Sequence, residues 1–175
     1  NGTTFTLSVT QADQTAYSSS NLVLTMPGVG TIGIDQGAGG QGLDRIDDMI
    51  PTAWEETSGT GTPTGLQTVA GVGGSTNVEW GVSSDILPDG MSLHLAVSPR
   101  ATGAAANDKA TTVSDNGVGG GWDIVVQHSG LVDGLNVFAG MSEIEQLAED
   151  ASSATTGDRT QYAAGFTYAM GATTF

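Results

Sequence analysis

The chain has 175 residues, enough for one domain with a sizeable core, and its charge is strongly one-sided. Four Lys and Arg residues stand against 19 Asp and Glu residues, and this net charge of −15 argues against binding to nucleic-acid backbones or to anionic membrane surfaces. The chain contains no Cys, which excludes disulfides and thiol-based metal sites, and no apolar run approaches the ~20 residues of a transmembrane helix.

Apolar residues alternate with small or polar residues along most of the chain, as in the stretch MSLHLAVSP at 91–99. This two-residue period is typical of a β-strand with one apolar face and one polar face. The pattern predicts about eight strands of roughly 8–12 residues, a length that suits a tilted membrane-spanning strand. In chain order they centre on residues 4–10, 22–26, 32–34, 78–82, 91–98, 122–126, 135–141 and 162–170.

The second face of these strands consists mainly of Gly, Ala, Ser, Thr and other polar residues. Side chains this small would underpack the narrow interior of a small barrel, so the pattern favours a wide, water-filled barrel with its apolar face turned to lipid. A soluble all-β sandwich remains an alternative, and in it the apolar faces would pack inward against each other.

The connections between the predicted strands alternate in length. Turn signals mark short connections at 27–28, 87–90 and 129–134, whereas longer connections of about 40, 20 and 15 residues follow Ile34, Pro99 and Glu143. Short turns at one end and long loops at the other are typical of outer-membrane β-barrels.

The longest connection, residues 35–75, carries a short helical stripe in LDRIDDMI at 43–50, which Pro51 ends. Acidic residues surround this stripe. One interpretation is a solvated surface loop whose acids keep it soluble. The sharper hypothesis is a loop that folds into the barrel and places carboxylates at a pore constriction. The candidate constriction residues are Asp44, Asp47, Asp48, Glu55 and Glu56.

The order of NLVLTMPGVGTIGIDQG, then the acidic GLDRIDDMIPTAWEE, then NVEWGVSSDI resembles the middle strands and inward-folded third loop of trimeric general porins of Gram-negative bacteria. The later stretches DGLNVFAGMSEIEQ and DRTQYAAGFTYAMGATTF also resemble porin strands. The resemblance spans nearly the whole chain. It implies an all-β transmembrane antiparallel barrel with a long inward-folded constriction loop, of about 16 strands in the full protein and about 8–9 in this chain.

On this resemblance, residues 1–175 form a partial porin β-barrel domain with its constriction loop at 35–75. Two unpaired sheet edges are not tolerated in lipid, so we expect the chain to be part of a longer polypeptide. The implied function is passive diffusion of small hydrophilic solutes and ions through the bacterial outer membrane. The implied partners are outer-membrane lipids and two further copies in a homotrimer.

The strand pattern also predicts which polar residues face the water-filled interior. They are Asp35, Glu79, His94, Asp123 and Gln127. Because carboxylates dominate this set and no Lys or Arg falls on a predicted lumen-facing strand position, a cation-preferring pore is a further hypothesis.

The sequence predicts no enzyme. The two His residues, His94 and His128, fall in separate strands, and no G-x-S-x-G motif occurs. No cofactor is expected, although the oxygen-rich segments DRIDD (44–48) and EDASSATTGD (149–158) leave calcium open as a ligand. Two rival functions also stay open: a small eight-stranded outer-membrane barrel with a structural or adhesive role, and a soluble secreted or capsid-like β-sandwich.

Overall fold

The structure is a computed structural model. It describes residues 2–10, 19–36, 40–46, 49, 76–98, 118–146, 159–170 and 173–174.

The described residues form β-strands and one short 3₁₀ helix, η1. The strands are β1 (Thr4–Thr10), β2 (Ser19–Met26), β3 (Gly30–Gln36), β4 (Thr76–Val82), β5 (Met91–Ser98), β6 (Val118–Ser129), β7 (Leu135–Gln146), β8 (Arg159–Met170) and the two-residue β9 (Thr173–Thr174). The helix η1 spans Gly42–Arg45. The all-β prediction is therefore confirmed, and each predicted strand has a counterpart.

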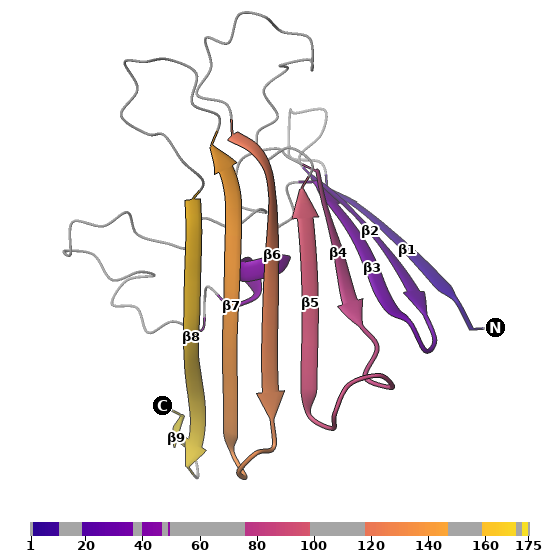
Figure 1. Ribbon diagram of the computed structural model, residues 1–175. Coiled ribbons are helices and arrows are strands. Elements are labelled where there is room, and N and C mark those ends of the chain that lie inside the picture. The colour runs from indigo at the N-terminus through magenta and orange to yellow at the C-terminus, as the bar shows by residue number, and fades with distance from the viewer. Residues whose placement is uncertain are drawn as a thin grey trace, which may run out of the picture.

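All strands belong to one sheet in which spatial order equals chain order, β1 to β9, with every neighbouring pair antiparallel (Figure 1). In such a meander the connections alternate between the two ends of the sheet. The segments 27–29, 83–90 and 130–134 join strands at one end, and 11–18, 37–75, 99–117 and 147–158 join them at the other. The predicted alternation of short and long connections is thus confirmed.

Strand register sorts the side chains into two opposite faces, because directly paired residues point to the same side of a sheet. One face, the apolar face, carries an apolar residue at every position of the row that crosses its middle. That row is Phe5, Leu24, Ile32, Trp80, Leu95, Ile124, Met141 and Tyr162. The neighbouring row on the polar face is Thr6, Val23, Gly33, Glu79, Ala96, Asp123, Ser142 and Gln161.

Burial is inverted relative to a soluble sheet, in which the apolar face is the covered one. On the apolar face Phe5, Phe166 and Tyr162 are 66%, 64% and 72% exposed, whereas Asp123 and Ser142 on the polar face are almost completely buried. Among the described strand residues, every large hydrophobic side chain that counts as exposed lies on the apolar face. The covered side of this sheet is therefore its polar side.

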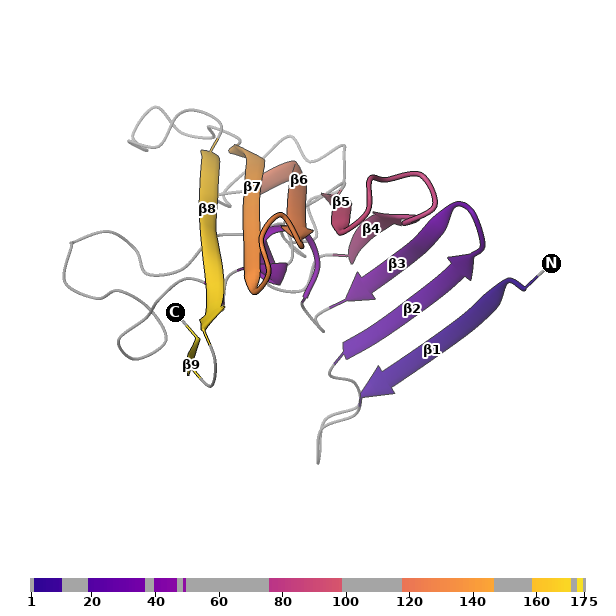
Figure 2. The same cartoon turned by 90° about the horizontal axis from the view of Figure 1, so that it is seen from below.

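The sheet bends into an open trough, with η1 on its inner side (Figure 2). The sheet is not closed into a barrel in the described part of the chain, where β1 and β9 occupy the two ends of the strand order and do not pair with each other. Strand twist curls the sheet, but a wide barrel needs more strands than these to complete its circumference.

At the end of the sheet with the short connections, each hairpin is bonded to the next through the backbone. The amide N–H groups of Ser83, Ser129 and Ala169 donate to the carbonyl oxygens of Val29, Gly90 and Gly134, at N···O distances of 3.1, 2.8 and 2.9 Å respectively. Gly90 and Gly134 adopt positive φ angles of 79° and 78°, which glycine accommodates without strain. The short turns therefore form a continuous hydrogen-bonded rim.

The long loop begins later than predicted, because Asp35 and Gln36 belong to β3. Of the predicted helical stripe at 43–50, the structure describes η1, from Gly42 to Arg45, and the buried Ile46 that follows it, whereas residues 47, 48 and 50 lie outside the described residues. A segment this short is held by its contacts with the sheet rather than by its own hydrogen bonds.

Candidate functional site

In the described part of the chain, residues Gln41–Ile46, which include η1, lie against the polar face of the sheet and are called the docked segment below. It contacts β5, β6 and β7 (Figures 1 and 2). Leu43 and Ile46 are fully buried, and they share the only hydrophobic cluster of the described residues with Val125, Phe138 and Ala163. The apolar core of the described chain therefore lies between this segment and the polar face.

Glycines on the polar face make room for the docked segment. A Cβ atom at Gly140 would lie 2.7 Å from Leu43 Cδ1 and 3.1 Å from Ile46 Cδ1, and one at Gly33 would lie 2.8 Å from Gln41 Nε2. Gly42 itself has a φ angle of +59°, a conformation that favours glycine. The small residues of this face suggested a water-filled interior, but in the structure the space beside Gly33 and Gly140 is occupied by the docked segment.

Two buried carboxylates of the sheet hold the backbone of the docked segment. The amide of Gly42 donates to Glu79 Oε2 on β4 at 2.7 Å, and the amide of Leu43 donates to Asp123 Oδ2 on β6 at 2.9 Å. Glu79 and Asp123 are only 3% and 1% exposed. Hydrogen bonds to ionised acceptors are about twice as strong as neutral ones, so this pair of consecutive amides fixes the position of the segment.

Glu79 is also the centre of a charged cluster. Arg45 Nε lies 3.0 and 2.9 Å from Glu79 Oε1 and Oε2, and Arg45 Nη2 also donates to Oε1. His94 Nδ1 on β5 lies 3.2 Å from Oε1, and this contact requires a proton on Nδ1 because an ionised carboxylate only accepts. The guanidinium, the imidazole and the Gly42 amide together compensate the burial of the Glu79 charge.

The predicted lumen-facing residues all lie on the polar face. Asp35 is 1% exposed and accepts a hydrogen bond from Asn21 Nδ2 at 3.1 Å, and Gln127 Nε2 lies 3.5 Å from Met49 Sδ. Glu79 and Asp123 are covered by the docked segment, so they bind the loop rather than form an open acidic surface. The structure brings Glu79, His94 and Asp123 to one place, whereas Asp35 on β3 lies between Asn21 of β2 and Asn77 of β4.

Of the predicted constriction residues, Asp44 lies in η1 and accepts a hydrogen bond from the amide of Gly40. The other four, Asp47, Asp48, Glu55 and Glu56, lie outside the described residues.

Sequence reasoning missed Arg45 and the backbone amides of Gly42 and Leu43. The available signal was that Arg45 is the first cation of the chain and stands in the glycine-rich run GAGGQGLDR. A cation that follows 44 residues without Lys or Arg is a candidate partner for the acids on neighbouring strands.

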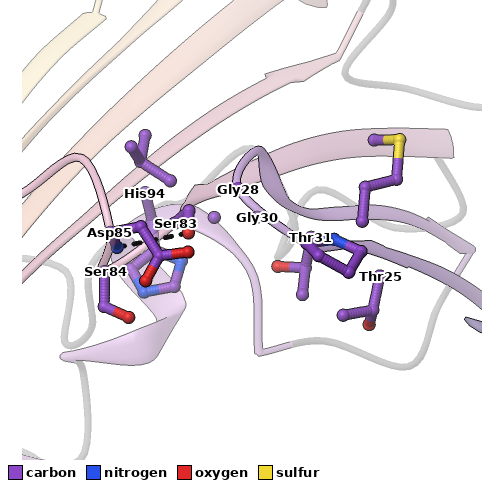
Figure 3. A pocket seen from close by; sticks show the side chains of 12 residues that line it. Thr25, Gly28, Gly30, Thr31, Ser83, Ser84, Asp85 and His94 are labelled. Carbon is purple, nitrogen blue, oxygen red and sulfur yellow. Dashed lines mark hydrogen bonds between the residues drawn. The ribbon is translucent and has the colours of Figure 1, made fainter. Parts of the chain in front are cut away.

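A second feature of the polar face is a pocket of about 310 Å³ near the short turns (Figure 3). Hydroxyl groups of Thr25, Thr31, Ser83 and Ser84 line it, together with Asp85, and the amide of Asp85 donates to Ser83 Oγ at 3.3 Å. His94 also lines this pocket, so its imidazole connects the pocket with the Glu79 cluster.

In the described part of the chain, no group of three or more His, Asp or Glu side chains is placed to hold a metal ion. The two segments considered for calcium lie partly or wholly outside it. Among the same residues, no helix is long and apolar enough to cross a membrane. No protein-family model, curated protein or solved structure matches the chain.

Proposed function

We propose that this chain is part of an outer-membrane channel of the general porin type, through which small hydrophilic solutes and ions diffuse passively. The observation that carries the proposal is the exposed apolar face. A row of apolar residues runs unbroken across eight strands, from Phe5 to Tyr162. Contiguous apolar surface of this extent needs a partner, and lipid hydrocarbon matches a continuous band on a sheet.

The docked segment supports the channel as opposed to a plain membrane sheet. The docked segment lies against the inner side of the trough. In a closed barrel, a segment at this place would narrow the water-filled interior. In the proposed function, residues 41–46 therefore belong to the pore constriction, and outer-membrane lipids cover the apolar face. The homotrimer remains an inference from the family resemblance.

A cation preference is part of the proposal. The acidic residues of the polar face and the docked segment in the described chain, Asp35, Asp44, Glu79 and Asp123, outnumber the basic ones, which are Arg45 and, by strand register, Arg159. An excess of fixed negative charge along a pore favours permeation of cations.

The two rival functions agree less well with the same observations. A soluble sandwich would bury its apolar faces between two layers, whereas here the apolar face carries all the exposed large hydrophobic side chains of the described strands. A closed eight-stranded barrel requires the first and eighth long strands to pair, and β1 and β8 lie at opposite sides of the strand order in the described chain.

The test is reconstitution of the full-length protein, extracted from membranes in detergent, into planar lipid bilayers. We expect stepwise increases in conductance and, in vesicles loaded with an osmolyte, entry of small sugars with a size limit. Heat-denatured protein is the control. Membrane insertion without conductance favours the small structural barrel, and protein that stays monodisperse in detergent-free buffer favours the soluble sandwich, so either outcome contradicts the proposal.

A further inference from the structure

The Arg45–Glu79 pair has an asymmetric position on the polar face. The Glu79 side chain is 4% exposed, whereas the Arg45 side chain is 34% exposed. The carboxylate therefore lies beneath the docked segment, and the guanidinium lies between it and the open side of the trough. An ion that approaches from that side meets Arg45 before Glu79.

The remaining groups around Glu79 do not change this order. His94 contacts Oε1 from the neighbouring strand β5, and the Gly42 amide contacts Oε2 from within the docked segment. Glu79 thus has hydrogen-bond partners on three sides, and Arg45 is the only one of them with a permanent charge. The pair is neutral as a whole, with its positive member toward water.

We propose that Arg45 is a specificity-determining residue: it neutralises Glu79 and sets the charge that the docked segment presents to permeating ions. The inference rests on the proposed function. It differs from the expectation drawn from the strand pattern, in which Glu79 acts as an open acidic group in the lumen. In the structure, the contribution of Glu79 to ion preference is cancelled until Arg45 is removed.

The experiment measures the potassium-to-chloride permeability ratio from reversal potentials in planar bilayers. For Arg45→Gln, which uncovers a carboxylate, we expect the ratio to rise about fivefold, the Boltzmann factor for a unit charge at ~4 Å in water. Glu79→Gln leaves the guanidinium unpaired and should lower the ratio. Arg45→Lys keeps the charge but loses the bidentate geometry, and it should keep the wild-type ratio.

The matched control for Glu79→Gln is Glu143→Gln, which makes the same chemical change at a position on the apolar face of β7. It should leave the ratio unchanged. If Arg45→Gln and Arg45→Lys shift the ratio equally, or Arg45→Gln leaves it unchanged, Arg45 acts only by positioning the loop and the inference is wrong. A wild-type protein that conducts nothing overturns the proposed function as well, which separates the two failures.

Discussion

At the scale of single residues, glycine on the inner side of the sheet determines where the loop can lie. Gly140 is the clearest case, because its missing side chain leaves the space that Leu43 and Ile46 occupy. A larger side chain at position 140 would have to occupy space that the fully buried Leu43 and Ile46 already fill.

We therefore expect Gly140→Val to displace the docked segment while the sheet stays folded. Overpacking of about 1–3 kcal/mol shifts the docking equilibrium by roughly 5–150-fold. The measurement is trypsin cleavage after Arg45, one of only four Lys and Arg residues in the chain, and it should become faster by a comparable factor. Cleavage after Arg100 provides an internal reference.

The matched control is Ala139→Val, the adjacent position of β7, which register places on the apolar face. It adds similar volume away from the docked segment. Equal cleavage rates after Arg45 in both variants and the wild type would show that Gly140 does not seat the loop.

At the scale of elements, the strands beneath the docked segment, β5, β6 and β7, have one face covered by that segment and one apolar face without a protein partner in the described chain. Strand β5 shows both: Ala96 and Ser98 are buried on the polar side, while Leu93, Leu95 and Val97 point the other way. The two environments predict opposite tolerances to charge.

Leu95→Lys tests the apolar side, since Leu95 lies in the middle row of the sheet. Facing hydrocarbon, the lysine should lower the free energy of unfolding by about 2–4 kcal/mol, measured by urea titration in lipid vesicles. Leu131→Lys is the control, because Leu131 is 60% exposed in the turn between β6 and β7 and should tolerate the charge. Equally small losses in both variants would contradict a lipid-facing Leu95.

At the scale of the whole molecule, the open trough leaves backbone groups of β1 without a strand on one side in the described chain. Unpaired amide and carbonyl groups cost several kcal/mol each in hydrocarbon, so a lipid-embedded sheet cannot keep such an edge. Further pairing at β1 and at β8–β9 is therefore a requirement of the proposed function.

Hydrogen exchange tests this requirement on the full-length protein in lipid vesicles. We expect amides of β1 to exchange as slowly as those of the central strand β5, because both would be paired on two sides. Fast exchange confined to alternate residues of β1, with β5 protected, would indicate a free edge and would argue against a closed barrel.

The strand pattern predicted much of this architecture, because alternation is a local property that register simply extends across the sheet. It identified the face that carries Glu79, His94 and Asp123. It did not predict that Glu79 and Asp123 are covered, since the groups that cover them include the main-chain amides of Gly42 and Leu43, which leave no trace in residue type. Contacts between a loop and distant strands produce no periodic pattern in the sequence, so pattern analysis cannot predict them.

The distances along the chain between partners imply an order of assembly. Each strand pairs with the one before it, so the sheet can grow hairpin by hairpin, with every new turn bonded to the preceding one. The docked segment is different, because the acceptors of its Gly42 and Leu43 amides, Glu79 and Asp123, lie 37 and 80 residues further along the sequence. Closing a loop over such separations costs more entropy than pairing neighbouring strands, so we expect the segment to dock only after β6 has paired, as a late step of folding.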